Sequence, residues 1–231
     1  MLRKKKAVVK RDTAIFNDKS PFAFKEAYRT LRTNLNFMTF SGEVRAIAVT
    51  SSIPDEGKSS VSINLARVLT LSGHRVLLVD ADLRKPSLQR YLRVRKQFGT
   101  GFSSLLSGQA KLEDVVYHYQ PLEFDVIFSG PVPPNASELL GRDSTKMLIE
   151  EMKTKYDFVI FDTPPSGVVT DASVLAQKVD GVIFTVRQKL AEKDVVRRAI
   201  KALQSKDANV LGIVLNDYVA AAGETNYGYG D

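Results

Sequence analysis

One stretch near the start of the chain restricts the possible folds more than any other. Residues 46–50 are a short apolar run, residues 52–59 have the sequence SIPDEGKS, and residues 59–71 have the apolar spacing of a helix. The eight-residue segment matches the phosphate-binding loop, or P-loop, except that Ser52 stands in place of the first glycine. A strand before this loop and a helix after it are its usual context. We therefore predict a P-loop at residues 52–59.

The residue types in this loop fit a nucleoside triphosphate bound with Mg²⁺. Backbone N–H groups of such a loop, and the N-terminal end of the helix after it, attract phosphate groups. Lys58 is expected to reach the β- and γ-phosphates, and the Ser59 hydroxyl is expected to ligate Mg²⁺. The predicted cofactors are therefore ATP and Mg²⁺, and the residues expected to line the nucleotide are Ser52, Pro54, Asp55, Glu56, Gly57, Lys58, Ser59 and Ser60.

The rest of the chain alternates between short apolar runs and segments of helical length. The apolar runs are residues 75–80, 124–129, 158–162, 181–187 and 210–216, and the helical segments are residues 21–40, 144–155, 171–178 and 192–206. Strands that alternate with helices form parallel sheets, which bind ligands at the carboxyl ends of their strands. The predicted fold class is α/β, with a doubly wound, mainly parallel sheet of the P-loop NTPase type. At 231 residues, a single domain is expected.

Three aspartates stand where strands should end at the ligand edge of this sheet. Asp80 and Asp82 follow the second apolar run, and Asp162 closes the run at 158–162. Strand alternation would put Asp80 and Asp82 on one side of the sheet. Asp162 fits the metal-binding position of the Walker B motif. Of the other pair, one carboxylate can hold metal-bound water while the other accepts a proton from an attacking hydroxyl, and the spacing leaves open which does which.

Composition narrows the surroundings in which the chain works. It has no cysteine, which excludes disulfides and thiolate metal sites and suits a reducing cytoplasm. The sequence contains neither an apolar run of about 20 residues nor a signal peptide, so we expect a protein that neither spans a membrane nor is exported by itself. The net charge is +7, and six basic residues without an acid lie in the first eleven positions. This arm is either a solvated tail or a contact with an anionic surface, and no aromatic interleaving favours nucleic acid.

Taken together, the motifs resemble those of the bacterial tyrosine kinases of capsular and exopolysaccharide synthesis. The resemblance rests on the P-loop, on Asp80-Ala81-Asp82 followed by Arg84, and on Asp162-Thr163-Pro164-Pro165. It also includes SGPVPPN at residues 129–135, SELL at residues 137–140 and the closing Tyr-Gly-Tyr, and it runs from about residue 21 to the end. A chain of this length is similar to the stand-alone cytoplasmic form of Gram-positive bacteria, in which a separate membrane protein supplies an activating segment.

The resemblance implies specific roles for residues of this chain. Lys58, Asp80 and Asp82 would take part in catalysis, with Asp80 as the base that removes the tyrosine proton. Ser59, Asp82 and Asp162 would hold Mg²⁺. The purine pocket would lie near Asn216, with Arg187 beside it.

Assembly and regulation are implied in the same way. Glu26, Arg29 and Arg32 repeat every three residues along one helical face and resemble an oligomerisation motif that closes subunits into a ring, an octamer by resemblance. Tyr227 and Tyr229 resemble the tyrosine cluster that neighbouring subunits phosphorylate. Further expected partners are a transmembrane activator, which would recruit the cytoplasmic chain to the inner face of the membrane, a tyrosine phosphatase and protein substrates. The expected division is a basic flexible arm at 1–20, a kinase domain at 21–219 and a flexible tyrosine-containing tail at 220–231.

Two other classes of protein share part of this pattern. A partitioning or division-site ATPase has the same loop but carries a second lysine near its start, where this chain has Ile53, and has no use for a tyrosine tail. A nucleotide-binding scaffold without kinase activity would keep Lys58 but tolerate the loss of Asp80. Both remain alternatives to the kinase interpretation.

Overall fold

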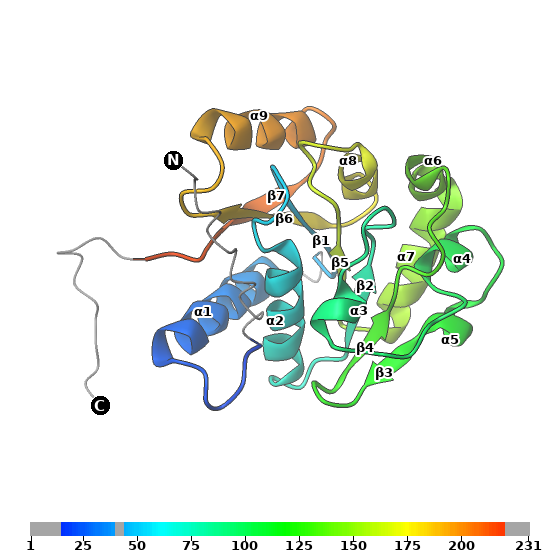
Figure 1. Cartoon of the computed structure of the whole chain (residues 1–231), viewed down its shortest axis with the longest axis horizontal. Coiled ribbons are helices and arrows are strands. Elements are labelled where there is room, and N and C mark those ends of the chain that lie inside the picture. The colour runs from blue at the N-terminus through cyan, green and yellow to red at the C-terminus, as the bar shows by residue number, and fades with distance from the viewer. Residues whose placement is uncertain (1–14, 40–43, 220–231) are drawn as a thin grey trace, which may run out of the picture.

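A computed structural model of the chain describes residues 15–39 and 44–219, and its centre is a seven-stranded sheet (Figure 1). The strand order is β3-β4-β2-β5-β1-β6-β7. The pairs that link β4, β2, β5, β1, β6 and β7 are all parallel, whereas β3 runs antiparallel to β4 at one edge. The strands are β1 (Ala46–Ser51), β2 (Val76–Asp80), β3 (Tyr117–Tyr119), β4 (Phe124–Ile127), β5 (Phe158–Asp162), β6 (Gly181–Arg187) and β7 (Val210–Asn216).

Helices cover both faces of this sheet, which makes it doubly wound. The helices are α1 (Phe22–Thr39), α2 (Lys58–Thr70), α3 (Leu88–Tyr91), α4 (Phe102–Leu106), α5 (Leu112–Val115), α6 (Ala136–Gly141), α7 (Asp143–Lys155), α8 (Asp171–Ala176) and α9 (Lys193–Gln204). Buried side chains of α1, α2 and α3 pack on one face, and those of α4 to α9 pack on the other. The predicted fold class is therefore confirmed.

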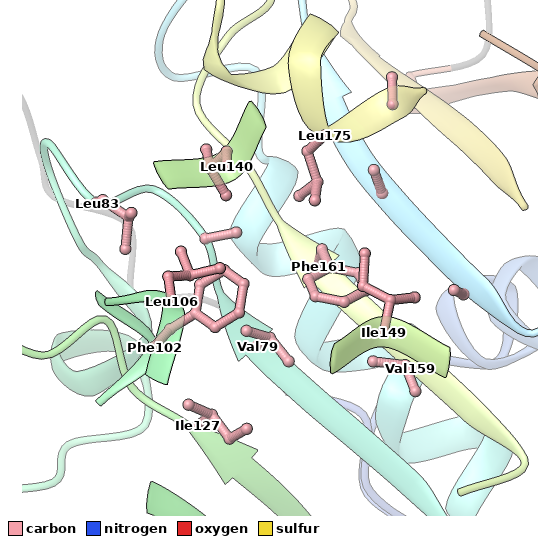
Figure 2. Packing of buried hydrophobic residues seen from close by; sticks show 14 of the residues in the cluster. Val79, Leu83, Phe102, Leu106, Ile127, Leu140, Ile149, Val159, Phe161 and Leu175 are labelled. Carbon is pink, nitrogen blue, oxygen red and sulfur yellow. The ribbon is translucent and has the colours of Figure 1, made fainter. Parts of the chain in front are cut away.

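The central strands owe their form to burial on both faces. All six residues of β1 are buried, with Ala46 and Ala48 packing into one hydrophobic cluster and Ile47 and Val49 into the other. This period of two is what a strand between two helical layers requires. Figure 2 shows the cluster on the α4–α9 side, where Phe102 and Phe161 pack with their ring centroids 6.0 Å apart. The two clusters fix the register of the strands and so the positions of their carboxyl ends.

Several sequence predictions differ from the structure in the stretch that follows β2. The strand β3 and the short helices α3 to α6 were not predicted, because each has six residues or fewer and so shows little periodicity. The strand-alternation argument for Asp80 and Asp82 does not hold, because β2 ends at Asp80 and Asp82 lies in the loop after it. Among helices in the described part of the chain, none combines the length and apolar character that crossing a membrane requires.

Candidate nucleotide-binding and catalytic site

The loop between β1 and α2 is braced from within by the side chain of Glu56. One oxygen of this buried carboxylate accepts hydrogen bonds from the Ser52 amide at 2.7 Å, the Ser52 hydroxyl at 2.8 Å and the Ile53 amide at 2.9 Å. Ser52, the residue that departs from the usual glycine, therefore contributes a second donor to the brace. Sequence reasoning listed Glu56 only as a loop residue beside the nucleotide and did not foresee this use of its side chain.

Gly57 ends the loop in a conformation that few other residues adopt. Its φ is +91°, in the left-handed region, and it is the residue before the first turn of α2. A Cβ on Gly57 would overlap the side-chain amide of Asn216, which comes from the end of β7. The same Asn216 amide donates to the Glu56 carbonyl at 3.0 Å. The loop is thus pressed against the end of the last strand, where the sequence had placed the purine pocket.

Arg187, at the end of β6, reaches the same loop from its outer side. Its backbone N–H lies 3.4 Å from the second Glu56 oxygen, and its guanidinium donates to the Asp55 carbonyl at 3.3 Å. An ion pair of 2.7 Å with Asp217 holds the guanidinium in place. The structure therefore brings Arg187 and Asn216 together with Asp55, Glu56 and Gly57, as the prediction of a common nucleotide site requires.

Two other residues of the predicted loop, Pro54 and Ser60, do not take part in these contacts. Pro54 is exposed at the tip of the loop. The Ser60 hydroxyl forms a hydrogen bond with Tyr28 of α1, which partly offsets the rise that burial causes in the tyrosine pKa. The Ser60 side chain therefore contacts α1.

Asp162, at the end of β5, lies beneath the start of α2. The Ser62 hydroxyl donates to its Oδ1 at 3.2 Å, and Ser59 forms a further hydrogen bond with the carboxylate. Burial raises the pKa of Asp162 to about 6, and the nearby charge of Lys58 opposes that rise. The residues expected to hold phosphate and metal, Lys58, Ser59 and Asp162, therefore lie in one cluster.

Asp80 ends β2 directly beside Asp162, its partner in the parallel register. The side chain is fully buried, and its Oδ2 accepts the backbone N–H groups of Ser87 at 3.1 Å and Leu88 at 3.0 Å. Its Oδ1 is buried and has no hydrogen-bond partner among the described residues. Burial, followed by the charge of Asp162, raises the Asp80 pKa well above its usual value. A buried oxygen with no partner is expected where a bound ligand supplies one.

Asp82 lies two residues farther on, in the loop that leads to α3. Its Oδ1 accepts the Lys85 amide at 2.9 Å. Burial raises the Asp82 pKa, while the Lys85 N–H and the charge of Lys58 lower it. Because the charge of Asp82 also acts on Asp80 and on Asp162, all three predicted acids share one site with Lys58.

Comparisons with known proteins show to which family the chain belongs. Residues 44–227 match the family described as ParA, NUBPL iron-transfer P-loop NTPase. The chain is 37% identical to the tyrosine-protein kinase YwqD of Bacillus subtilis (strain 168) over 204 residues, which are 88% of this chain and 85% of YwqD. It resembles the solved kinase domain of the Escherichia coli tyrosine kinase Etk with a TM-score of 0.81 at 38% identity, covering 89% of this chain and 80% of that one. The chain belongs to the bacterial tyrosine kinases.

The predicted family and enzyme class are thereby confirmed. The match covers only part of some relatives and extends, more distantly, to other proteins of the same fold. Within full-length Etk of Escherichia coli (strain K12), this kinase matches only 28% of the protein. A more distant likeness, with a TM-score of 0.64 at 27% identity, joins it to the septum site-determining protein MinD of Pyrococcus horikoshii, solved with Mg-ADP, over 76% of this chain and 71% of that one. The kinase thus shares its fold with other P-loop NTPases, in agreement with its match to the ParA family.

The site of this kinase is suited to a nucleotide with Mg²⁺. The left-handed Gly57 before α2 is typical of a phosphate-binding loop, and the partnerless Asp80 oxygen can accept a hydrogen bond from a bound group. Among the described residues, no group of three or more acidic or histidine side chains could hold a metal unaided. Mg²⁺ in proteins takes one or two carboxylates and completes its shell with water and phosphate oxygens. Ser59, Asp82 and Asp162 are the residues that would hold it.

Several contacts at the edge of the kinase site were not predicted. The Ser87 hydroxyl lies 2.8 Å from that of Ser59. Arg84 binds the buried Asp171 through two nitrogens, at 2.7 and 3.0 Å, and Ser137 donates to the same carboxylate. Arg84 and Ser137 had been noted only as parts of motifs. Their partner Asp171 had been named only as the start of a helical segment, because its contact with Arg84 joins residues 87 positions apart.

Proposed function

We propose that this chain is an ATP-dependent protein-tyrosine autokinase that phosphorylates tyrosines near the C-terminus of neighbouring subunits. The observation that carries the proposal is the meeting of Lys58, Ser59, Asp80, Asp82 and Asp162 at the carboxyl edge of one parallel sheet. Phosphoryl transfer asks a protein mainly for positioning and for charge stabilisation, which such a cluster can supply. The similarity to YwqD supports tyrosine as the acceptor.

Asp80 is the residue best placed to receive the tyrosine proton. Its Oδ2 is held by two backbone N–H groups, while its Oδ1 is left without a protein partner. The raised pKa of Asp80 makes the carboxylate a stronger base than one in water, and a base is most effective when its pKa lies near the working pH. Asp80 would bind the hydroxyl through Oδ1 and hold the proton there.

Lys58 and the loop would orient the phosphates. Loop N–H groups and the Lys58 ammonium would bind the phosphate oxygens, while Arg187 and Asn216 would border the nucleoside beside residues 55–57. Bound Mg²⁺, held by Ser59, Asp82 and Asp162, would neutralise charge on the phosphates. The Glu56 brace would keep the loop in shape before the nucleotide arrives, which reduces the entropic cost of binding.

The substrate and the setting of the reaction are part of the proposal. Tyr227 and Tyr229, the expected acceptors, lie outside the described residues. By family resemblance we propose a role in capsular or exopolysaccharide synthesis, with a cytoplasmic kinase recruited to the membrane by a transmembrane activator and reset by a tyrosine phosphatase. Each phosphate adds about −1.5 to −2 charges, which would weaken further docking of the tail at an acidic site.

Assembly into a ring would bring one subunit's tail to its neighbour. On α1, Tyr28 and Leu35 are buried against the domain, whereas Glu26 and Arg29 form a surface ion pair of 2.6 Å with side chains 42% and 51% exposed. The Glu26–Arg29 pair is therefore exposed, and we propose that the face it shares with Arg32 contacts a second subunit. Arg29→Ala with Arg32→Ala should reduce a large assembly to a monomer in light scattering after gel filtration, whereas Arg197→Ala, in a similar surface pair with Asp194 on α9, should not. An unchanged mass would remove the ring.

Mass spectrometry of the full chain after incubation with Mg²⁺-ATP tests the proposal, with and without the cytoplasmic segment of a candidate membrane partner. We expect phosphate on Tyr227 and Tyr229, none in Lys58→Met or Asp80→Asn, and intact ATP binding in Tyr227→Phe/Tyr229→Phe. Phosphotyrosine signals that persist in both active-site variants would reject the assignment.

The match to the ParA family favours one second candidate, an ATPase switch that hydrolyses ATP without a protein acceptor. Ile53, at the position of the second lysine of such ATPases, argues against it. Release of inorganic phosphate with no phosphotyrosine, under all the conditions above, would favour this alternative.

A further inference from the structure

Arg84 lies in the same short segment as Asp82, but its side chain contacts residues outside the active site. The segment from Ala81 to Ser87 joins β2 to α3, and at its ends Ala81 donates to the Asp162 carbonyl at 2.8 Å and Ser87 donates to Asp80. Between these ends, the hydrogen bond from Lys85 to Asp82 is internal to the segment. The position of Asp82 therefore depends on what holds the middle of the segment to the rest of the domain.

Two neighbouring side chains provide that hold. Leu83 is fully buried in the same cluster as Leu140 of α6, and Figure 2 shows both at the margin of the cluster nearest the loop. Arg84 then reaches the first residue of α8, where its Nε and one terminal nitrogen bind the two oxygens of Asp171 at 2.7 and 3.0 Å. A guanidinium that binds a carboxylate through two parallel hydrogen bonds fixes direction as well as distance.

Asp171 and Ser137 make this contact stronger than a surface ion pair. The Asp171 side chain is completely buried, and Ser137 of α6 donates to the same carboxylate. Burial alone would raise the Asp171 pKa, but the hydrogen bonds from Arg84 and Ser137 bring it below its usual value. Ser137 is the first residue of the SELL segment at residues 137–140, to which the proposed function assigns no other role.

We propose, on the basis of the proposed function, that Arg84 is a positioning residue whose clamp on Asp171 and Ser137 holds Asp82 where it binds the magnesium of the nucleotide. The clamp joins three segments that are far apart in sequence: the Asp82 loop, the start of α6 and the start of α8. Its loss would leave Asp82 free to move and would leave the Asp171 charge, which already acts on Asp82, without its partner. Groups that orient a metal ligand typically change metal affinity or activity by roughly 10- to 100-fold when removed.

The test uses the whole chain and compares Arg84, after the end of β2, with Arg75, before its start. Arg84→Gln removes the clamp, while Arg75→Gln removes a similar pair, with Asp157 at 3.0 Å, from the opposite end of β2. The readouts are the Mg²⁺ concentration that half-saturates binding of a fluorescent ATP analogue, the same quantity for autophosphorylation, and the melting temperature. We expect Arg84→Gln to raise the Mg²⁺ requirement at least tenfold and to change metal-free ATP binding less than twofold. Arg75→Gln should keep the wild-type Mg²⁺ requirement, although loss of its pair with Asp157 should lower the melting temperature.

A double variant separates positioning from stability. Arg84→Gln/Asp171→Asn leaves no unpaired buried charge, so its melting temperature should return toward that of the wild type while its Mg²⁺ requirement stays high. The clamp is refuted if the Mg²⁺ requirement of Arg84→Gln is unchanged, or if it recovers together with the melting temperature. A wild type that binds Mg²⁺-nucleotide but phosphorylates nothing would refute the proposed function and leave the clamp to be judged by the binding data.

Discussion

The Asn216 side chain packs against the P-loop at Gly57. Its amide donates to the Glu56 carbonyl at 3.0 Å and occupies the space where a Cβ on Gly57 would stand. The relationship joins residues 160 positions apart in the chain. Two features therefore favour glycine at position 57. One is its left-handed backbone, and the other is the close approach of Asn216 at the end of β7.

Gly57→Ala should therefore abolish detectable ATP binding while the protein remains folded. The added methyl group collides with Asn216 and strains a backbone at φ +91°. Isothermal titration calorimetry with ATP and Mg²⁺ measures the effect. Gly73→Ala is the matched control, because Gly73 has φ +89° but nothing within 4 Å of an added Cβ, so it carries the strain without the collision.

The variant Gly57→Ala/Asn216→Ala tests the collision directly. Asn216→Ala alone is the reference, because it removes the hydrogen bond to Glu56 and the proposed contact with the nucleoside. On that background Gly57→Ala should cost less ATP affinity than it does in the wild type, since the collision is gone and the backbone strain remains. An equal loss on both backgrounds would mean that strain, rather than the approach of β7, accounts for the glycine.

Glu56→Ala should weaken ATP binding at least tenfold and lower the melting temperature. It removes the acceptor for the Ser52 and Ile53 amides in a buried loop, and each unsatisfied buried group costs about 1–3 kcal/mol. Titration calorimetry and thermal unfolding measure the two effects. Glu151→Ala, which breaks an exposed 3.2 Å pair with Lys155, is the control and should change neither. ATP affinity that stays at the wild-type level in Glu56→Ala would show that the brace is dispensable.

Much of this site could be predicted from the sequence because its signals are local. The strand, loop and helix around Lys58 lie within 25 residues, and the apolar runs before Asp80 and Asp162 mark strand ends directly. Parallel order then brings those ends to one edge of the sheet. The family, the fold class and the meeting of the three aspartates followed from these facts.

The remaining features depend on contacts that no local pattern reports. The pairing of Arg84 with Asp171 requires knowledge of how α6 and α8 stand beside the loop after β2. The Glu56 brace joins residues only four positions apart, yet it requires the positive φ of Asp55 to turn the chain back toward Ser52. β3 escaped prediction because a strand of three residues has no measurable period.

Asp80→Asn should abolish tyrosine phosphorylation and raise the melting temperature. The substitution removes a charge that burial and Asp162 both disfavour, as the raised pKa of Asp80 shows. Each kcal/mol gained corresponds to about 2–4 °C for a chain of this size. Differential scanning calorimetry is the measurement. The control is Asp157→Asn, which should lower the melting temperature because Arg75 holds the Asp157 pKa below its usual value. An Asp80→Asn protein that melts below the wild type would contradict the account of a strained site.

Titration of Asp162 should make the free energy of unfolding depend on pH. Its folded pKa of about 6 is above the usual value of 3.8, so between these values the folded state binds a proton that the unfolded state does not. The resulting stabilisation is complete below pH 3.8 and is lost as pH rises through 6. Without Mg²⁺, the free energy of unfolding from urea titrations should therefore fall by about 1–2 kcal/mol more between pH 5 and 8 in the wild type than in Asp162→Asn. Asp80 adds a trend of the same sign to both proteins, so the variant should reduce the slope rather than remove it. Equal slopes in the two proteins would mean that Asp162 is charged throughout this range.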